Sequence, residues 1–161
     1  MTDFFNKADL SRNDAEKIIS ETLNNCDDGE LYLENSKSES ILLDDGKIKN
    51  STYSSDLGYG LRAVTGEVIA YSHSNEISKN SLKQSADNLS STLKSKKGVY
   101  NHKIPKTNEQ FYKNINPIDE KSLQSKLELL KEVNNYTRSK SEIVHQVTAS
   151  FSGEQKSIEI I

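Results

Sequence analysis

The sequence predicts an α+β fold: an antiparallel sheet of about four to six strands flanked by helices, followed by the start of a second α+β domain. Three observations support this fold class. Apolar residues recur at helical spacing in three segments, and alternating apolar residues mark strands between them. Two turn signals, Asp45-Gly46 and Thr65-Gly66, join neighbouring strands. The length of 161 residues suits one domain with the beginning of another.

The first helix is expected from about residue 12 to residue 25. Ser11 followed three residues later by Asp14 resembles a capping box, in which side chains satisfy the free amides of the first helical turn. Apolar residues then recur at helical spacing. The run Asp27-Asp28-Gly29 is expected to end this helix.

Strands are expected after residue 30, where the apolar period changes to two. Asp45-Gly46 is a hairpin signal because both residues tolerate the positive φ angles of a type I′ turn. Two further strands are expected around Thr65-Gly66. The expected strands are 31–34, 41–43, 47–53, 58–64 and 68–71.

A second helix is expected after Asn75, ending near Gly98. Residues 99–118 contain Pro105 and many polar residues without a sustained period, so they are expected to form a linker. The predicted division is therefore an N-terminal domain over 1–98, a linker over 99–118 and the truncated start of a middle domain over 119–161. The apolar face of the second helix is expected to consist of Leu82, Ala86, Leu89 and Leu93.

Asp119 is expected to be the N-cap of a third helix, with Ile118 and Leu123 at the spacing of a hydrophobic staple. Two last strands, 143–152 and 156–161, are expected to form a hairpin around Gly153-Glu154. The final strand is apolar, and an unpaired edge there would be a pairing or aggregation hazard. The apolar stripe of the third helix is expected to contain Leu123, Leu127, Leu130 and Val133.

Composition argues against several classes of partner. The net charge is -3, so no general positive field exists to hold a nucleic-acid backbone. No window approaches the roughly 20 apolar residues of a membrane span, and the N-terminus does not resemble a signal peptide. With the single cysteine Cys26 no intrachain disulfide is possible, and the expected compartment is the cytoplasm.

No histidine lies in a zinc-binding motif. A helical zinc site needs two histidines about one turn apart with a carboxylate nearby, whereas His73, His102 and His145 are widely separated and none is followed by Glu. We therefore expect surface or strand histidines. The alternative is that the three histidines converge in the fold and form a zinc site. Cys26 has no basic neighbour in sequence that would lower the pKa of its thiol, which favours a structural cysteine over a reactive one.

Gly58-Tyr59-Gly60 is the glycine pair of most interest. A phosphate-binding loop would lead from a strand into a helix, but a strand pattern follows here, so nucleotide binding is disfavoured. Glycines inside a strand more often mark a bulge or the close approach of another backbone. Arg62, which follows, is expected to pair with Asp56 or Glu67, with a substrate carboxylate as the alternative.

Three aspartates, Asp44, Asp45 and Asp56, suggest a cation site by residue type, but they lack the ligand spacing of a calcium loop. Turn chemistry accounts for Asp44 and Asp45.

An ordered set of segments, spread over most of the chain, resembles the N-terminal part of the TldD/PmbA (TldE) family of zinc metalloproteases, and TldD more than PmbA. Each segment alone is weak, but their order over more than a hundred residues is specific. The segments are Leu31-Tyr32-Leu33, Ser38-Glu39-Ser40, 45–49, 58–67, Ala70-Tyr71-Ser72, Glu76-Ile77-Ser78 and 147–153.

The resemblance implies a cytosolic zinc metallopeptidase that acts in proteolysis of unfolded or modified peptides as a TldD–TldE heterodimer. It also implies that the zinc motif, His-Glu-x-x-x-His, belongs to a C-terminal domain that this sequence does not contain. We therefore expect no catalytic, cofactor-binding or metal residue in this chain, and inactivity when it is alone. Expected partners are a TldE/PmbA-like subunit, or a second copy in a homodimer, and peptide substrates, with no nucleic acid and no membrane.

Two alternatives to this function stay open on the sequence. The first is a stand-alone, non-enzymatic module that binds either peptides or a protease subunit by adding a strand to a sheet edge. The second is a gene remnant without a function.

Overall fold

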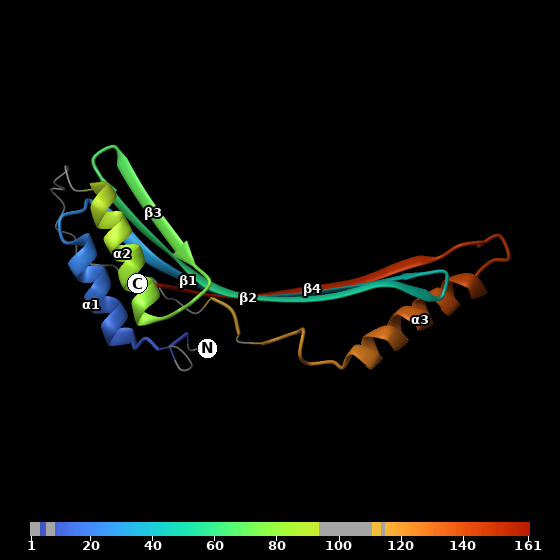
Figure 1. The fold of residues 1–161 in the computed structure, drawn as a ribbon. Helices are drawn as coiled ribbons and strands as arrows, with labels where there is room; N and C mark the ends of the chain where they lie inside the picture. Colours follow the sequence, from blue (N-terminus) through green and yellow to red (C-terminus); the bar gives the residue numbers. More distant parts are fainter. Residues whose placement is uncertain (1–3, 6–8, 94–110, 114) are drawn as a thin grey trace. The chain divides into compact units, whose positions relative to one another are not determined.

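The computed structural model describes residues 4–5, 9–93, 111–113 and 115–161. The four strands form one sheet in the order β3-β2-β1-β4, and helices flank it, which confirms the α+β class with an antiparallel sheet (Figure 1). The elements in chain order are α1 (Arg12–Leu23), β1 (Asp28–Asp44), β2 (Lys47–Thr65), β3 (Val68–Ser74), α2 (Lys79–Leu93), α3 (Leu123–Ser139) and β4 (Thr148–Ile160).

The chain folds into two compact units that interleave in sequence. The first unit comprises the described parts of 1–35, 56–113 and 157–161, and the second those of 36–55 and 114–156. The sequence had suggested successive domains at 1–98 and 119–161. The units interleave because β1, β2 and β4 each contribute residues to both. That residues 119–161 begin a middle domain stays a prediction.

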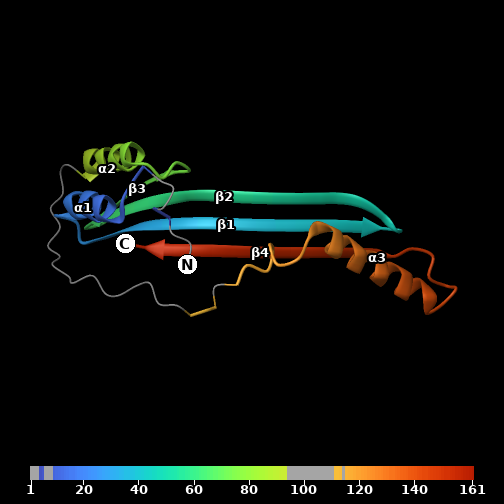
Figure 2. The ribbon, with the colours of Figure 1, turned by 90° about the horizontal axis from the view of Figure 1, so that it is seen from below.

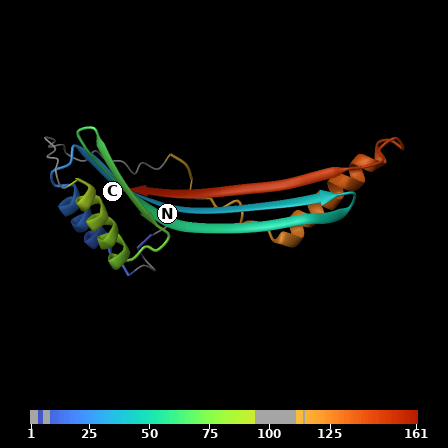
Figure 3. The same cartoon turned by 45° about the horizontal axis from the view of Figure 1, so that its top comes forward.

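In the first unit, α1 and α2 lie on the same face of the sheet (Figures 1 and 3). The expected apolar face of α2 is confirmed, because Leu82, Ala86, Leu89 and Leu93 are all buried in this core. Each large side chain that is fully buried contributes about 1.5–3 kcal/mol of transfer free energy. The strands supply the matching surface, which includes Leu31, Leu33, Leu61 and Ala63.

The first helix begins where the sequence predicted. Ser11 is the N-cap, and its side chain accepts a hydrogen bond from the Asp14 amide at 3.1 Å. The helix ends at Leu23, two residues before the expected end. The expected end of α2 near Gly98 and most of the expected linker lie outside the described residues.

Strands β1 and β2 are each longer than expected. The sequence predicted separate strands at 31–34 and 41–43, but β1 is one strand from Asp28 to Asp44. Likewise, β2 continues from Lys47 through Thr65, across the expected break at 54–57. The intervening residues are polar except Leu57, so the apolar alternation fades there although the backbone stays in the sheet. The predicted turn is confirmed, with φ of 53° at Asp45 and 76° at Gly46.

In the second unit, α3 packs on the strands through a small core (Figure 2). Its N-cap is Ser122, whose side chain accepts from the Ser125 amide at 3.2 Å, so the expectation of Asp119 as N-cap was wrong. Asp119 instead accepts hydrogen bonds from Lys37 and Asn116. The core consists of Ile41, Leu43 and Leu130, with Leu127, Ala149 and Phe151 packed against it.

The buried stripe of α3 was also predicted wrongly in part. Leu123 is 53% and Val133 43% exposed, whereas Lys126 and Asn134 are buried with Leu130 between them. With Ser122 as the N-cap, Ile118 is not the residue directly before the cap, so the expected staple of Ile118 with Leu123 was wrong. Lys126 can occupy the stripe because strand β1 presents a carboxylate, Glu39, to this helix.

The last segment is one strand, so the hairpin expected around Gly153-Glu154 was wrong. Strand β4 pairs with β1: Leu31 and Ile161 exchange two backbone hydrogen bonds of 2.8 and 2.9 Å. The apolar end of the chain is therefore paired along one side. Among the helices that the structure describes, none is both long and apolar enough to cross a membrane.

Candidate functional site

The two strand glycines, Gly58 and Gly60, belong to β2 and lie beside the end of β3. Strands β2 and β3 pair from Tyr59 opposite Ser74 to Thr65 opposite Val68, so Gly58 falls just outside this pairing. A Cβ atom on Gly58 would lie 2.7 Å from the Ser74 carbonyl oxygen. The predicted close approach of another backbone is confirmed at this glycine.

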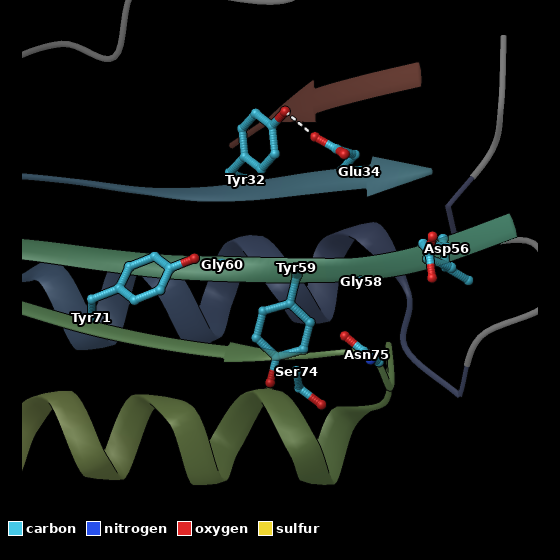
Figure 4. Close-up of a pocket in the computed structure, with 10 residues that line it drawn as sticks. Tyr32, Glu34, Asp56, Gly58, Tyr59, Gly60, Tyr71, Ser74 and Asn75 are labelled. Atoms are coloured by element: carbon cyan, nitrogen blue, oxygen red, sulfur yellow. Dashed lines mark hydrogen bonds between the residues drawn. The ribbon is translucent and has the colours of Figure 1, made fainter. Parts of the chain in front are cut away.

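Gly60 meets a side chain instead of a backbone. A Cβ atom there would lie 2.5 Å from the Tyr71 hydroxyl oxygen and 3.0 Å from the ring. The Tyr71 side chain therefore occupies the space above Gly60 (Figure 4). Because Gly58 and Gly60 are two apart, both open the same face of β2.

These glycines form the floor of a groove of about 220 Å³, which we call the glycine groove (Figure 4). Its walls come from β1 on one side and from the end of β3 on the other. The described part of the lining contains two carboxylates and three tyrosines. The lining residues are Tyr32, Glu34, Asp56, Leu57, Gly58, Tyr59, Gly60, Tyr71, Ser74 and Asn75.

Tyr59 holds the floor of the glycine groove in place. Its backbone lines the groove, but its ring points to the opposite face, towards α2 (Figure 4). The buried hydroxyl lies 2.9 Å from both Ser81 Oγ and Ser85 Oγ of α2. Ser72 of β3 donates to the same Ser85 Oγ at 3.0 Å. This network ties β2, β3 and α2 together directly beneath the glycines.

Tyr32 and Glu34 form a hydrogen-bonded pair in the wall of the groove. The Tyr32 hydroxyl donates to Glu34 Oε2 at 2.5 Å (Figure 4). Burial, and then the hydrogen bond and negative charge of Glu34, raise the pKa of Tyr32 to about 12. The tyrosine is therefore neutral at neutral pH, and its hydroxyl group is held as a donor to Glu34.

Arg62 has different partners from those predicted. It donates to Asp28 Oδ2 at 2.7 Å and to Glu30 Oε1 at 3.1 Å, so the expected pairing with Asp56 or Glu67 was wrong. The pair is internal, as predicted, but it crosses to the neighbouring strand β1. The hydrogen bond to Asp28 is the main cause that raises the pKa of the guanidinium. These partners could not be predicted from the sequence, because it does not show the register in which β1 pairs with β2.

Two of the three histidines lie among the described residues. His73 is exposed and its ring stacks on Tyr71, with ring centroids 5.9 Å apart. His145 is exposed in the second unit, and His102 lies outside the described residues. Within 4–5, 9–93, 111–113 and 115–161, no three His, Cys, Asp or Glu side chains form a group that could hold a metal ion. The described residues therefore do not fit the zinc that the resemblance implies for the family.

Cys26 packs against the core of the first unit and its thiol donates to the Thr22 carbonyl at 3.8 Å. This contact is consistent with a structural cysteine. Of the three aspartates, Asp44 accepts from Gln146 and Thr148, which lower the pKa of its carboxyl group. Asp45 occupies the turn and pairs with Arg138, and Asp56 lines the glycine groove.

The second unit contains a buried ion pair between Lys126 and Glu39. Lys126 Nζ lies 2.5 Å from Glu39 Oε1 and 2.6 Å from the Ile118 carbonyl oxygen. The two side chains are 5% and 10% exposed. The ammonium group also lies 5.7 Å from the Phe151 ring centroid. The buried ammonium group of Lys126 is therefore paired within the protein, and we interpret this ion pair as structural.

The sequence alone did not indicate that Tyr32, Glu34 and Tyr71 line the same groove. One signal was available, because alternation along β3 places Tyr71 on the face opposite the buried Ala70. The signal for Tyr32 and Glu34 was absent, since their position relative to Gly60 depends on the register of β1 with β2.

The chain is similar to known metallopeptidase sequences. Residues 29–93 match the family model described as PmbA/TldA metallopeptidase domain 1. A metalloprotease TldD homolog of Buchnera aphidicola subsp. Acyrthosiphon pisum is 36% identical over 133 residues, which cover 82% of this chain and 28% of the relative. The homolog of Haemophilus influenzae is 32% identical over 143 residues, covering 85% and 29%. The chain spans less than a third of the length of these relatives.

Solved structures support the fold. The crystal structure of TldE from Thermococcus kodakarensis superposes with a TM-score of 0.61 at 14% identity, covering 91% of this chain and 34% of that chain. A structure from Thermotoga maritima gives a TM-score of 0.63 at 13% identity, covering 92% and 34%.

Proposed function

The chain belongs to the PmbA/TldD family of metallopeptidases, and from this premise we propose that it serves as the non-catalytic N-terminal part of a zinc metallopeptidase that cleaves unfolded or modified peptides. The observation that carries the proposal is the match of residues 29–93 to the first domain of the family. In this role the chain shapes the approach of a peptide to a catalytic domain and contacts a partner subunit in the cytoplasm.

The chemistry of the described residues supports a non-catalytic role. Peptide hydrolysis by zinc needs histidine or carboxylate ligands with an open coordination position and a base for the bound water. His73 stacks on Tyr71, and Glu39 is engaged with Lys126. No step of hydrolysis is therefore assigned to this chain.

Reconstitution tests the proposal. The 161-residue chain is purified alone and after co-expression with a PmbA/TldE-type subunit, and hydrolysis of an unfolded peptide library is followed by mass spectrometry. We expect no hydrolysis by the chain alone and a co-purifying complex in the second preparation. Chelator-sensitive hydrolysis by the chain alone would contradict the proposal, and so would the absence of any complex with a TldE-type or second TldD-type subunit.

A stand-alone binding module is the second candidate, and one observation favours it. In the second unit, residues 47–53 of β2 are exposed and lie before the segment that pairs with β3. Their outer backbone groups form an open sheet edge among the described residues, and such edges accept an added strand. Size-exclusion chromatography with light scattering discriminates: a stable monomer that captures no partner subunit and no extended peptide contradicts this function.

A further inference from the structure

The outer edge of β3 lacks the usual protection of a sheet edge. β3 is the first strand in the order β3-β2-β1-β4, so no strand among the described residues pairs with its outer side (Figure 1). Edge strands of soluble proteins are commonly protected from pairing by charged side chains, above all lysine, or by proline. Strand β3, Val68–Ser74, contains no lysine, arginine, aspartate, glutamate or proline. Its composition therefore favours pairing with a further strand.

The other open edges of the sheet carry charges. The exposed edge of β2 at residues 47–53 contains Lys47 and Lys49. Strand β4, on the opposite side of the sheet from β3, contains Glu154 and Lys156. Such charges oppose strand pairing because they lose hydration when another strand approaches. Within the part of the chain that the structure describes, β3 is therefore the uncharged edge.

Large apolar side chains of β3 are exposed on the face that α2 does not cover. Ala70, on the covered face, is 4% exposed and belongs to the core of the first unit. Ile69 and Tyr71, on the other face, are 66% and 64% exposed. The Tyr71 ring lies over Gly60 of β2, so it is directed towards the sheet and not across the outer edge (Figure 4).

The turn before β3 shows which backbone groups face outward. β2 and β3 are joined by the two-residue turn Gly66-Glu67, in which Gly66 has a φ of 60°. The residues that flank such a turn, here Thr65 and Val68, form a hydrogen-bonded pair. Because these pairs alternate along a strand, the even-numbered residues of β3 bond to β2. The odd-numbered residues present their N–H and C=O groups to the outer side.

The exposed face of β3 is complementary to itself. When two copies pair antiparallel about Ala70, Ile69 of each copy lies opposite Tyr71 of the other. Cross-strand pairs of an aromatic and a β-branched residue are favourable. In the same register the exposed Glu67 lies opposite the exposed His73 of the other copy. A carboxylate accepts a hydrogen bond from an imidazole and attracts its protonated form, so this register also matches charge.

We propose that β3 is the docking edge for β3 of a second copy of this chain, paired antiparallel about Ala70 in a two-fold dimer. Pairing of one strand with itself closes at two copies, whereas pairing of two different edges would leave an open edge at each end of the assembly. The proposal rests on the proposed function for its expectation of a partner subunit. The choice of edge and register rests on β3 itself.

Sedimentation velocity of the 161-residue chain over a range of concentrations tests the dimer. Ile69→Lys removes the apolar partner of Tyr71 at both symmetric contacts, and we expect it to raise the dissociation constant about tenfold. Ile48→Lys is the matched control, because Ile48 is also exposed, at 46%, but lies in the edge of β2. It should leave the dissociation constant unchanged. Circular dichroism checks that both variants are folded.

An exchange of charges tests the register. Glu67→Lys brings a lysine opposite His73 of the other copy, and His73→Glu brings two glutamates opposite each other, so each single change should weaken the dimer. The double variant places lysine opposite glutamate and should recover the dissociation constant of the unaltered chain. Within one copy the two positions are six residues apart, about 20 Å along an extended strand, so the recovery cannot arise inside one copy.

A chain that stays monomeric up to the millimolar range would overturn the proposal. Equal effects of Ile69→Lys and Ile48→Lys, or a double charge variant without recovery, would overturn it too. Capture of a TldE-type subunit at β3 in place of a second copy would do the same. These outcomes differ from failure of the proposed function, which fails on chelator-sensitive hydrolysis by the chain alone or on the absence of any complex through any surface.

Discussion

Tyr32 and Glu34 show how one hydrogen bond and burial together change the titration of a side chain. The 2.5 Å contact and burial raise the pKa of the tyrosine, so the proton stays on its hydroxyl group well above neutral pH. Both residues lie in β1, two positions apart, so both point to the same face of the sheet.

Titration of this pair is the first prediction. The folded pKa of Tyr32 is about 12, raised from the ordinary value of 10.0, so the pair stabilises the fold fully below pH 10 and loses this contribution as the pH rises towards 12. In a spectrophotometric tyrosine titration, Tyr32→Phe should remove one late-titrating group. Glu34→Gln should move that group to lower pH. An unchanged titration curve in Tyr32→Phe would show that Tyr32 is not the late group.

Gly58 gives a second prediction at the residue scale. Gly58→Ala should destabilise the protein by about 1–3 kcal/mol, because the new Cβ lies 2.7 Å from the Ser74 carbonyl oxygen in a rigid strand. Gly153→Ala is the matched control, since its nearest atom lies at 3.6 Å. The control should be neutral, or stabilising by up to about 1 kcal/mol through the unfolded chain. Urea denaturation measures both, and equal effects would contradict the close approach at Gly58.

Part of this site could be predicted from the sequence. The glycine pair, the internal pairing of Arg62 and the turn at Asp45-Gly46 follow from local chemistry, which the sequence contains. The partners of Arg62 and the contribution of Tyr32 do not, because they depend on the register between β1 and β2. Register is fixed by packing of the whole sheet, and a shift of one residue would exchange the two faces.

At the scale of elements, α3 shows how tertiary contacts override a local pattern. Its apolar residues suggested a stripe through Leu123 and Val133, yet the structure buries Lys126 and Asn134. The buried lysine is possible because Glu39 and a backbone carbonyl satisfy it. The burial of Lys126 in α3 therefore follows from its contact with Glu39 in the polar stretch of β1. Neither residue alone indicates this burial.

The N-cap of α3 provides a third prediction. Ser122→Ala should lower stability by about 1 kcal/mol, because it removes the acceptor for the Ser125 amide. Asp119→Ala removes an exposed ion pair with Lys37 and should cost less, between about 0 and 1 kcal/mol. Chemical denaturation monitored by circular dichroism compares the two. A larger loss for Asp119→Ala would favour the N-cap expected from sequence.

The buried pair of Lys126 and Glu39 gives the fourth prediction. Lys126→Met alone should cost about 3–5 kcal/mol, since it leaves a buried carboxylate without its partner. The double variant with Glu39→Leu should recover most of this loss, because replacing a whole buried pair by apolar groups is often neutral. Lys131→Met, on the exposed side of α3, is the control and should have little effect. Additive losses in the double variant would show that the two charges do not interact.

For the whole molecule, sequence alone predicted the fold class and the family, because both rest on many weak signals that agree in order. It did not predict that each of β1, β2 and β4 is one continuous strand. Polar residues interrupt the apolar alternation in the middle of these strands, and only pairing with neighbours shows that the backbone stays extended. The division into interleaved units follows from that continuity and could not be derived from a linear reading.

The central claim is that this chain acts within a PmbA/TldD-type metallopeptidase without supplying the zinc site. Metal analysis of the purified 161-residue chain, after zinc loading and gel filtration, tests it most directly, with hydrolysis of an unfolded peptide measured on the same sample. We predict zinc far below one ion per chain and no hydrolysis. Stoichiometric zinc that is lost together with peptide hydrolysis on chelation would contradict the account.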